Sequence, residues 1–145
     1  MPGADGLGSR VGDAVRLLLD THILVWWFES SGRLTPGQDQ AIAGAKNGKS
    51  MLVSDISLWE VATLVNLGRL SLTLPLRDWL EKATAGPLVE RLPITPAVAA
   101  QVAALPDSFH RDPADRVIVS TALTENAILL TADARIIESG LVRTL

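Results

Sequence analysis

Short apolar runs alternate along this chain with longer segments in which apolar residues recur at helical spacing. Brief apolar runs bounded by polar or turn residues are typical of strands buried on both faces. Because these strands alternate with helical segments, the pattern predicts an α/β fold of three layers (α/β/α), with a mostly parallel central sheet. The predicted strands are 15–19, 51–53, 88–92, 128–131 and 142–145, and the predicted helices are 22–28, 36–46, 55–67, 75–86, 96–105, 113–123 and a short one through 136–137.

Polar residues at the helix starts support these boundaries. Thr21 and Ser54 can each cap the helix that follows, because a hydroxyl oxygen accepts a bond from the free backbone N–H groups of the first turn. Asp112 is a good N-cap for the longest C-terminal helix, and Pro113 suits its first position, where an N–H would have no partner. Asp115 then falls in the first turn, where the helix dipole favours a negative charge.

The length of 145 residues and a hydrophobic content of 48% predict one globular domain with its own core. Residues 1–14 hold several glycines and few large apolar residues, so we expect a flexible N-terminal tail before a single domain at 15–145. Asn47–Gly48 predicts a turn between a helix and a strand.

The composition excludes several classes of site. Cysteine is absent, so disulfides, thiolate metal sites and cysteine nucleophiles are excluded. The net charge of −3 is unlike that of most passive nucleic-acid binders, which are basic, so we expect a bound cation to mediate any contact with a polyanion. The longest apolar stretch, 17–28, is too short to span a membrane and contains Asp20 and His22. No segment reads as a signal peptide, so we expect a cytoplasmic protein.

Four acidic residues fall where a parallel sheet would bring them together. Asp20 ends the first predicted strand, and Asp133 follows the strand at 128–131 by two residues. Glu60 comes early in the helix after the second strand, and Asp115 lies in the first turn of a later helix. Because sites in open parallel sheets form beyond the carboxyl ends of the strands, we expect all four side chains at the same edge.

Crowded carboxylates repel one another and raise each other's pKa, so such a cluster needs a cation. Oxygen ligands without cysteine, and with only two histidines in the chain, favour Mg²⁺ or Mn²⁺ over zinc. A metal ion held by carboxylates activates water and neutralises the charge that develops on a phosphoryl group. The residues therefore predict metal-assisted hydrolysis of a phosphodiester bond.

Two other interpretations use the same acids. In a non-catalytic binding or regulatory module of the same α/β class, each acid would only cap a helix or oppose a helix dipole. A phosphoryl-accepting regulatory domain would need an acid pair after the first strand and a late lysine, whereas Asp20 stands alone and the last lysine is Lys82. Specific binding of Mn²⁺ or Mg²⁺ separates the nuclease from the binding module.

Each acid lies in a short motif, and the motifs are LLLDTH at 17–22, SLWEVA at 57–62, HRDPADR at 110–116 and LTAD at 130–133. In this order they resemble the acidic motifs of PIN-domain ribonucleases, specifically the VapC-type toxins of bacterial toxin–antitoxin pairs. The resemblance covers 15–145. It implies a PIN-like fold and a Mg²⁺- or Mn²⁺-dependent endoribonuclease that cleaves RNA. It also implies a homodimer that a cognate antitoxin holds inactive by inserting a peptide near the site.

The resemblance also implies roles for the acids, all of which would be catalytic. Asp20 and Asp115 would be metal ligands, and Glu60 would complete the first metal site directly or through water. Asp133 would hold a water molecule or a second metal ion. Only one acid follows Thr131, where some relatives place two, so the number of metal ions stays open.

Three further residues have two interpretations each. Thr131 could contact the substrate through its hydroxyl, or bond the backbone at a strand end. Arg111 and Arg116 could bind RNA phosphates, or form surface ion pairs. Asp112 is expected to cap its helix rather than bind metal.

The histidines and the aromatic run are expected to lie outside the chemistry. His22 and His110 are interpreted as structural or peripheral, because a metal-activated water needs no histidine base. Trp26, Trp27 and Phe28 are consecutive and cannot all face one side of a helix. We expect some of them in the core, with others available to a second subunit or the antitoxin.

Overall fold

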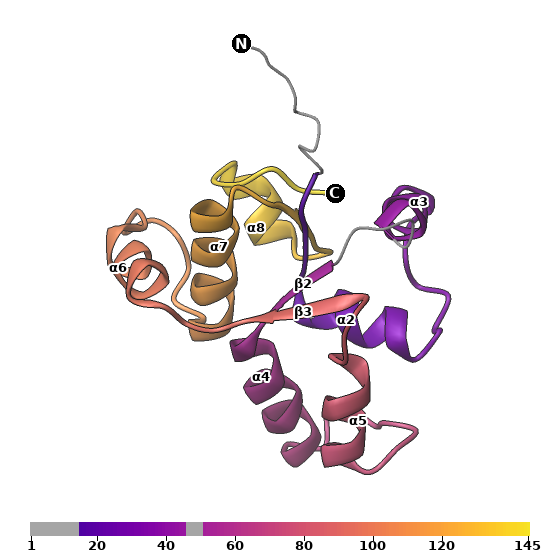
Figure 1. The fold of residues 1–145 in the computed structure, drawn as a ribbon. Helices are drawn as coiled ribbons and strands as arrows, with labels where there is room; N and C mark the ends of the chain where they lie inside the picture. Colours follow the sequence, from indigo (N-terminus) through magenta and orange to yellow (C-terminus); the bar gives the residue numbers. More distant parts are fainter. Residues whose placement is uncertain (1–14, 46–50) are drawn as a thin grey trace.

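The computed structural model describes residues 15–45 and 51–145, so the predicted tail at 1–14 and the predicted turn at Asn47–Gly48 lie outside the described residues. Within these ranges a parallel sheet has the strand order β3-β2-β1-β4 (Figure 1). Its strands are β1 (Leu17–Leu19), β2 (Met51–Ser54), β3 (Val89–Leu92) and β4 (Ile128–Leu130). Every residue of β1 and β2 is buried, which explains why both read as uninterrupted apolar runs.

The predicted last strand at 142–145 is reduced to one parallel bridge between Leu129 and Thr144. Three backbone hydrogen bonds accompany the bridge, including one from Thr131 N–H to the Leu145 carbonyl at 3.2 Å. The earlier part of the segment does not pair with β4, because Leu141 and Val142 pack against a hydrophobic cluster instead. Leu141 and Val142, both partly buried, therefore pack beside this cluster instead of extending the sheet.

Seven helices cover the described part of the sheet in two layers (Figure 1). They are α2 (Thr21–Phe28), α3 (Pro36–Ala45), α4 (Asp55–Asn66), α5 (Leu76–Ala83), α6 (Pro96–Ala104), α7 (Pro113–Glu125) and α8 (Ala134–Ser139). Side chains of α2, α3 and α5 pack on one face of the sheet and those of α7 and α8 on the other, where α6 packs against α7. Helix α4 starts directly after β2 and packs against both α2 and α7. The predicted three-layer α/β/α architecture is confirmed.

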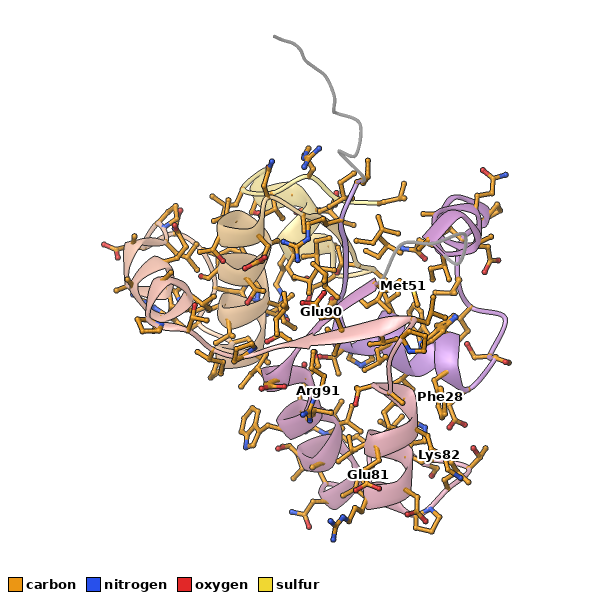
Figure 2. The ribbon with its side chains drawn as sticks, viewed as in Figure 1. Phe28, Met51, Glu81, Lys82, Glu90 and Arg91 are labelled. Atoms are coloured by element: carbon orange, nitrogen blue, oxygen red, sulfur yellow. The ribbon has the colours of Figure 1, made fainter. Side chains whose placement is uncertain are left out.

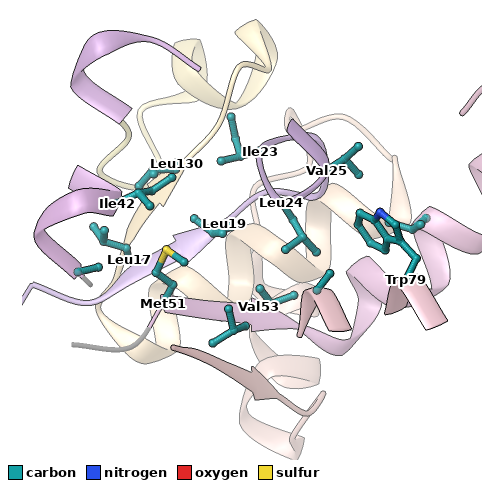
Figure 3. Close-up of a cluster of buried hydrophobic side chains, with 14 residues drawn as sticks. Leu17, Leu19, Ile23, Leu24, Val25, Ile42, Met51, Val53, Trp79 and Leu130 are labelled. Carbon is teal, nitrogen blue, oxygen red and sulfur yellow. The ribbon is translucent and has the colours of Figure 1, made fainter. Parts of the chain in front are cut away.

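The period-two alternation of strand side chains separates two cores. Leu17 and Leu19 face the layer of α2 and α3, whereas Leu18 faces α7. Figure 3 shows the first core, in which Trp79 of α5 packs among aliphatic side chains. Trp79 is fully buried, and its indole N–H donates to Glu29 Oε2 at 2.7 Å, so its polar atom stays satisfied.

The three consecutive aromatic residues at the end of α2 all pack against this first core. Trp26, Trp27 and Phe28 are each partly buried, so none of them is fully enclosed. The Phe28 ring meets the Trp79 ring edge-on at a centroid distance of 5.4 Å. The expected division into core residues and surface residues is not seen, because all three are partly buried against the same core.

The helix starts follow the predicted caps with one correction. Ser54 and Asp112 cap α4 and α7 through bonds from Ile56 N–H and Asp115 N–H. For α2, however, the cap is Asp20 and not Thr21, because the Asp20 carboxylate accepts the Thr21 N–H at 2.8 Å. Thr21 is already helical, and its hydroxyl donates to Ser57 Oγ at 2.9 Å.

Strand β3 forms one edge of the sheet and carries Glu90 and Arg91 at its centre, both exposed (Figure 2). Charged residues on an edge strand discourage pairing with another chain. The Arg91 guanidinium also lies 3.8 Å from Asp55 Oδ1, which ties the edge to the start of α4. In the described ranges, no helix combines the length and apolar character that crossing a membrane requires.

Candidate functional site

The site lies at the carboxyl edge of the sheet, where the chain changes direction across it. From β1 the chain proceeds to β2 and β3 on one side, and it later places β4 on the other side of β1. Such a switch in strand order leaves a crevice beyond the strand ends. Asp20 directly follows β1, and Thr131 directly follows β4, so both residues border this crevice.

A cavity of about 280 Å³ occupies this position. Its walls come from the residues after β1 and β4, from α2, α4 and α8, and from the start of α7. The residues that line it are Asp20, His22, Trp26, Glu60, Asp112, Asp115, Ala132, Asp133 and Arg135. The structure thus brings together all four acids that the sequence singled out, and it adds Asp112 to them.

Asp20 is held rigidly on the cavity floor. It is 5% exposed, and burial raises the pKa of its carboxyl group above the ordinary value. Oδ1 accepts the Thr21 N–H, and Oδ2 accepts the Thr131 hydroxyl at 2.6 Å. The Thr131 oxygen in turn accepts the Asp133 N–H at 3.0 Å. Thr131 therefore links Asp20 to Asp133 and fixes how the Asp20 carboxylate is presented.

Asp115 enters the cavity from the first turn of α7. Its Oδ2 lies 2.7 Å from His110 Nε2, and its backbone N–H donates to the capping Asp112. Burial, together with the charges of Asp20 and Asp112, raises the pKa of Asp115 to about 7. The carboxylate is therefore costly to ionise unless a further cation approaches it.

Glu60 projects from the second turn of α4 and is half-buried. Its Oε1 atom is buried and has no hydrogen-bond partner in the structure. Burial raises the pKa of Glu60, and the neighbouring charges of Asp20 and Asp112 raise it further. A buried, unpartnered carboxylate oxygen beside other carboxylates is a position that a cation would stabilise.

Asp133 differs from the other three acids because it caps α8. Its Oδ1 accepts the backbone N–H groups of Arg135 and Ile136 at 2.8 and 3.3 Å. Its Oδ2 lies 3.3 Å from the Arg135 guanidinium. Burial alone would raise the pKa of Asp133, but these hydrogen bonds outweigh burial and lower it. Asp133 is thus ionised and already partnered.

This donor set fits a hard divalent cation. The convergent ligands are carboxylate oxygens, the type that Mg²⁺ and Mn²⁺ prefer. The unpartnered Glu60 oxygen and the raised pKa values of Asp20 and Asp115 indicate carboxylates that a nearby positive charge would stabilise in their ionised form. Asp20, Glu60 and Asp115 are the residues that could hold such an ion.

A family model described as "PIN domain" matches residues 17–140 of the chain. The chain belongs to the PIN domain family. Over 120 residues it is 38% identical to Ribonuclease VapC22 of Mycobacterium tuberculosis (strain ATCC 25618 / H37Rv), an alignment that covers 83% of this chain and 88% of that relative. The family predicted from the four acidic motifs is therefore confirmed.

Solved structures share the fold of this PIN domain. VapBC2 from Rickettsia felis, bound to a DNA fragment of its promoter, matches with a TM-score of 0.68 at 15% identity, over 90% of this chain and 98% of that one. A toxin–antitoxin complex from Klebsiella pneumoniae matches with a TM-score of 0.58 at 19% identity, over 87% and 94%. FitAcB from Neisseria gonorrhoeae matches with a TM-score of 0.58 at 21% identity, over 89% and 96%.

The two arginines considered as phosphate contacts have different environments in this PIN domain. Arg111 is exposed at the end of the loop before α7. Arg116 is 8% exposed, and its guanidinium donates to the carbonyls of Phe109 and His110, both at 3.1 Å. Arg116 therefore ties that loop to α7, and its guanidinium is directed away from solvent. This geometry argues against a phosphate contact by Arg116.

Sequence reasoning missed the contributions of His110 and Arg135. His110, Asp115 and Asp133 each offer one potential metal-ligand atom, and these atoms lie within 4.8 Å of one another. His110 reaches the site from a loop, so no periodicity marked it. Arg135 lies two residues after Asp133, and this short spacing was the one available signal.

Proposed function

We propose that this PIN domain is a Mg²⁺- or Mn²⁺-dependent endoribonuclease that hydrolyses RNA phosphodiester bonds and acts as the toxin of a toxin–antitoxin pair. One observation carries the proposal, namely that Asp20, Glu60, Asp115 and Asp133 line one cavity in which Glu60 Oε1 lacks a partner. The 38% identity to a protein named a ribonuclease supports the choice of RNA as substrate.

In this proposal Asp20, Asp115 and Glu60 hold the ion, and Asp133 adds negative charge beside it. When bound, a divalent ion in such a site activates water and offsets charge on a phosphoryl group. Thr131 orients the Asp20 carboxylate through its hydrogen bond, and His110 orients Asp115. Such hydrogen-bond partners fix the direction of a ligand's lone pairs, and removing one commonly weakens metal binding by about tenfold or more.

The RNA would reach the site from the open side of the cavity. The exposed Arg111 could contact a backbone phosphate near the cavity, a role for which Arg116 is poorly placed because its guanidinium is buried. Single-stranded or looped RNA suits such a site better than a duplex, because its backbone and bases are accessible. Trp26 contributes to the cavity wall, where an aromatic face can meet an unstacked base.

The proposed regulator is a cognate antitoxin protein. An acidic cavity attracts cationic groups, so a basic antitoxin segment could occupy it and exclude RNA. One solved structure of the same fold, from Klebsiella pneumoniae, is named as a toxin–antitoxin complex. A homodimer and a cytoplasmic location stay predictions that rest on the family resemblance and on the sequence.

The proposal is tested by incubating total RNA with purified, antitoxin-free protein in Mn²⁺, in Mg²⁺ and in EDTA. Asp20→Asn serves as the inactive variant, and Asp78→Asn, an exposed acid in the first turn of α5, serves as the matched control. We expect discrete fragments from the wild type and the control in metal only.

Cleavage that persists in EDTA or in Asp20→Asn would contradict the proposed chemistry. Absence of both cleavage and specific metal binding in folded protein would favour the non-catalytic binding module instead. Because Asp20 also caps α2, circular dichroism of the variant has to show an intact fold before its inactivity is interpreted.

A further inference from the structure

Arg135 supplies a positive charge inside the acidic cavity. Of the described residues that line this cavity, it alone carries a permanent positive charge. Its guanidinium lies 3.6 Å from Asp115 Oδ2 and 3.3 Å from Asp133 Oδ2, so it bridges acids from two different helix starts. Its side chain is nonetheless 60% exposed, and the cation is therefore held by charge rather than by packing.

On this side of the cavity, Arg135 competes with a second metal ion for Asp133. Both oxygens of Asp133 are occupied, one by two backbone N–H groups of α8 and the other by Arg135. Binding a metal through Asp133 would break the cap of α8 or displace the guanidinium. Glu60, in contrast, has an unpartnered oxygen, and it lines the same cavity as Asp20.

Arg135 also faces a second cavity next to the first. This cavity measures about 390 Å³, and its lining includes Phe109, His110, Glu138 and Ser139 besides Arg135. Because Arg135 lines both cavities, its guanidinium stands at the boundary between them. A nucleic-acid strand that occupied both cavities would pass a phosphate across this boundary, where the planar donor fork of arginine suits phosphate oxygens.

We propose that Arg135 is the second cation of this site. Its guanidinium pairs with Asp133 and approaches Asp115 in the place that a second metal ion would take, so the site holds a single divalent ion, for which Asp20, Glu60 and Asp115 are the candidate ligands. When RNA binds, the same guanidinium holds the phosphate that lies between the two cavities. The inference rests on the proposed function and deepens it, because it assigns the number of metal ions and a substrate contact.

Metal stoichiometry tests the first part without measuring activity. Calorimetric titration of EDTA-stripped protein with Mn²⁺ is compared between the wild type, Arg135→Gln and Arg135→Lys. The matched control is Arg77→Gln, because Arg77 is an exposed arginine on α5 that pairs with Glu81. We expect one Mn²⁺ per chain in the wild type, in the lysine variant and in the control, and two in Arg135→Gln.

Two Mn²⁺ ions in the wild type, or one in Arg135→Gln, would overturn the inference while leaving the metal-dependent nuclease standing. If folded wild type binds no Mn²⁺, both the inference and the proposed function fail. Because the Arg135 side chain is exposed, its substitution should leave the fold intact, and thermal melting of each variant checks this.

RNA binding tests the second part. Affinity for a single-stranded RNA oligonucleotide is measured by fluorescence anisotropy at several salt concentrations in the Asp20→Asn background. Adding Arg135→Gln should weaken binding and reduce the slope of log affinity against log salt by about 0.7, the value for one lost phosphate contact on a single strand. An unchanged slope would refute the phosphate contact, and Arg77→Gln should leave the slope unchanged.

Discussion

Replacing Asp115 with asparagine should stabilise the metal-free protein, although Asp115 is proposed as a metal ligand. The side chain is 9% exposed and lies in a cavity with Asp20 and Asp112, and burial and these charges outweigh the attraction of the exposed Arg135 guanidinium 3.6 Å away. Asparagine has nearly the same shape and keeps an oxygen that can accept a bond from His110. The substitution thus removes the charge and preserves most of the packing.

The size of the effect follows from the pKa of Asp115. Burial and nearby charges raise it from the ordinary value of 3.8 to about 7. A carboxyl group with a raised pKa in the folded state contributes its full stability below pH ~4, and that contribution is lost as the pH rises through ~7. A pKa raised from 3.8 to about 7 corresponds to at most ~4 kcal/mol of unfolding free energy, and because the neighbouring acids share the proton, we expect ~2–4 kcal/mol.

The assay is thermal and urea unfolding of EDTA-treated wild type and Asp115→Asn between pH 4 and 8. The two proteins should have similar stability at pH 4, and the variant should be more stable at pH 8, with a melting temperature higher by roughly 5–10 °C. Saturating Mn²⁺ should reduce or reverse this difference, because the wild type binds the ion more tightly.

Asp78→Asn controls for the general effect of removing an acid from the first turn of a helix, since Asp78 is exposed and lies outside the cavity. Its stability should change by only a few tenths of a kcal/mol. A variant Asp115→Asn that is less stable than the wild type at pH 8, or a difference that does not depend on pH, would refute the reasoning. Asp115 would then serve mainly to stabilise the fold.

Three other predictions concern neighbouring groups. Thr131→Val should lower RNA cleavage in a gel assay by about 10–100-fold, because Asp20 loses the hydroxyl that orients it, and should lower the unfolding free energy by ~1–3 kcal/mol. The control variant Thr124→Val, on the exposed surface of α7, should keep full activity in the same assay. Arg116→Met should destabilise the protein by ~2–4 kcal/mol in urea unfolding, because it leaves buried carbonyl groups without donors, and equal stability would show that the bonds contribute little. Mn²⁺ at a hundred times its dissociation constant should stabilise the wild type by ~2.7 kcal/mol, which EDTA should reverse; a melting temperature insensitive to the metal would mean that no ion binds the folded state preferentially.

Much of the architecture was already evident in the order of residues along the chain. Strands β1 and β2 are buried on both faces, so only apolar residues are tolerated there and the pattern is unambiguous. The start of α7 was predictable from Asp112 and Pro113, because Asp112 accepts a free backbone N–H of the first turn and Pro113 has no N–H that needs a partner. Where burial or backbone geometry is decided locally, the sequence was sufficient.

The convergence of the acids was predictable for a related reason. Asp20 follows β1 and Asp133 follows β4 at short distances, and all strands of the described sheet are parallel. Parallel strands place their carboxyl ends at one edge, so chain order alone translates into proximity. The segment at 142–145 was misjudged because an apolar run suits either a strand or a packed loop, and only the available space selects between them.

The hydrogen-bond and ion-pair partners of individual polar side chains were decided by the tertiary structure. Arg116 and Arg135 look alike as basic residues near acids, yet one donates to buried carbonyls and the other reaches into the cavity. Likewise one oxygen of Asp133 caps α8, whereas one oxygen of Glu60 has no hydrogen-bond partner. Local sequence limits which element a residue joins, but the direction and partners of a long polar side chain depend on groups distant along the chain. The positions of the acids could therefore be read from the sequence, whereas their division into candidate metal ligands, caps and paired charges required the folded molecule.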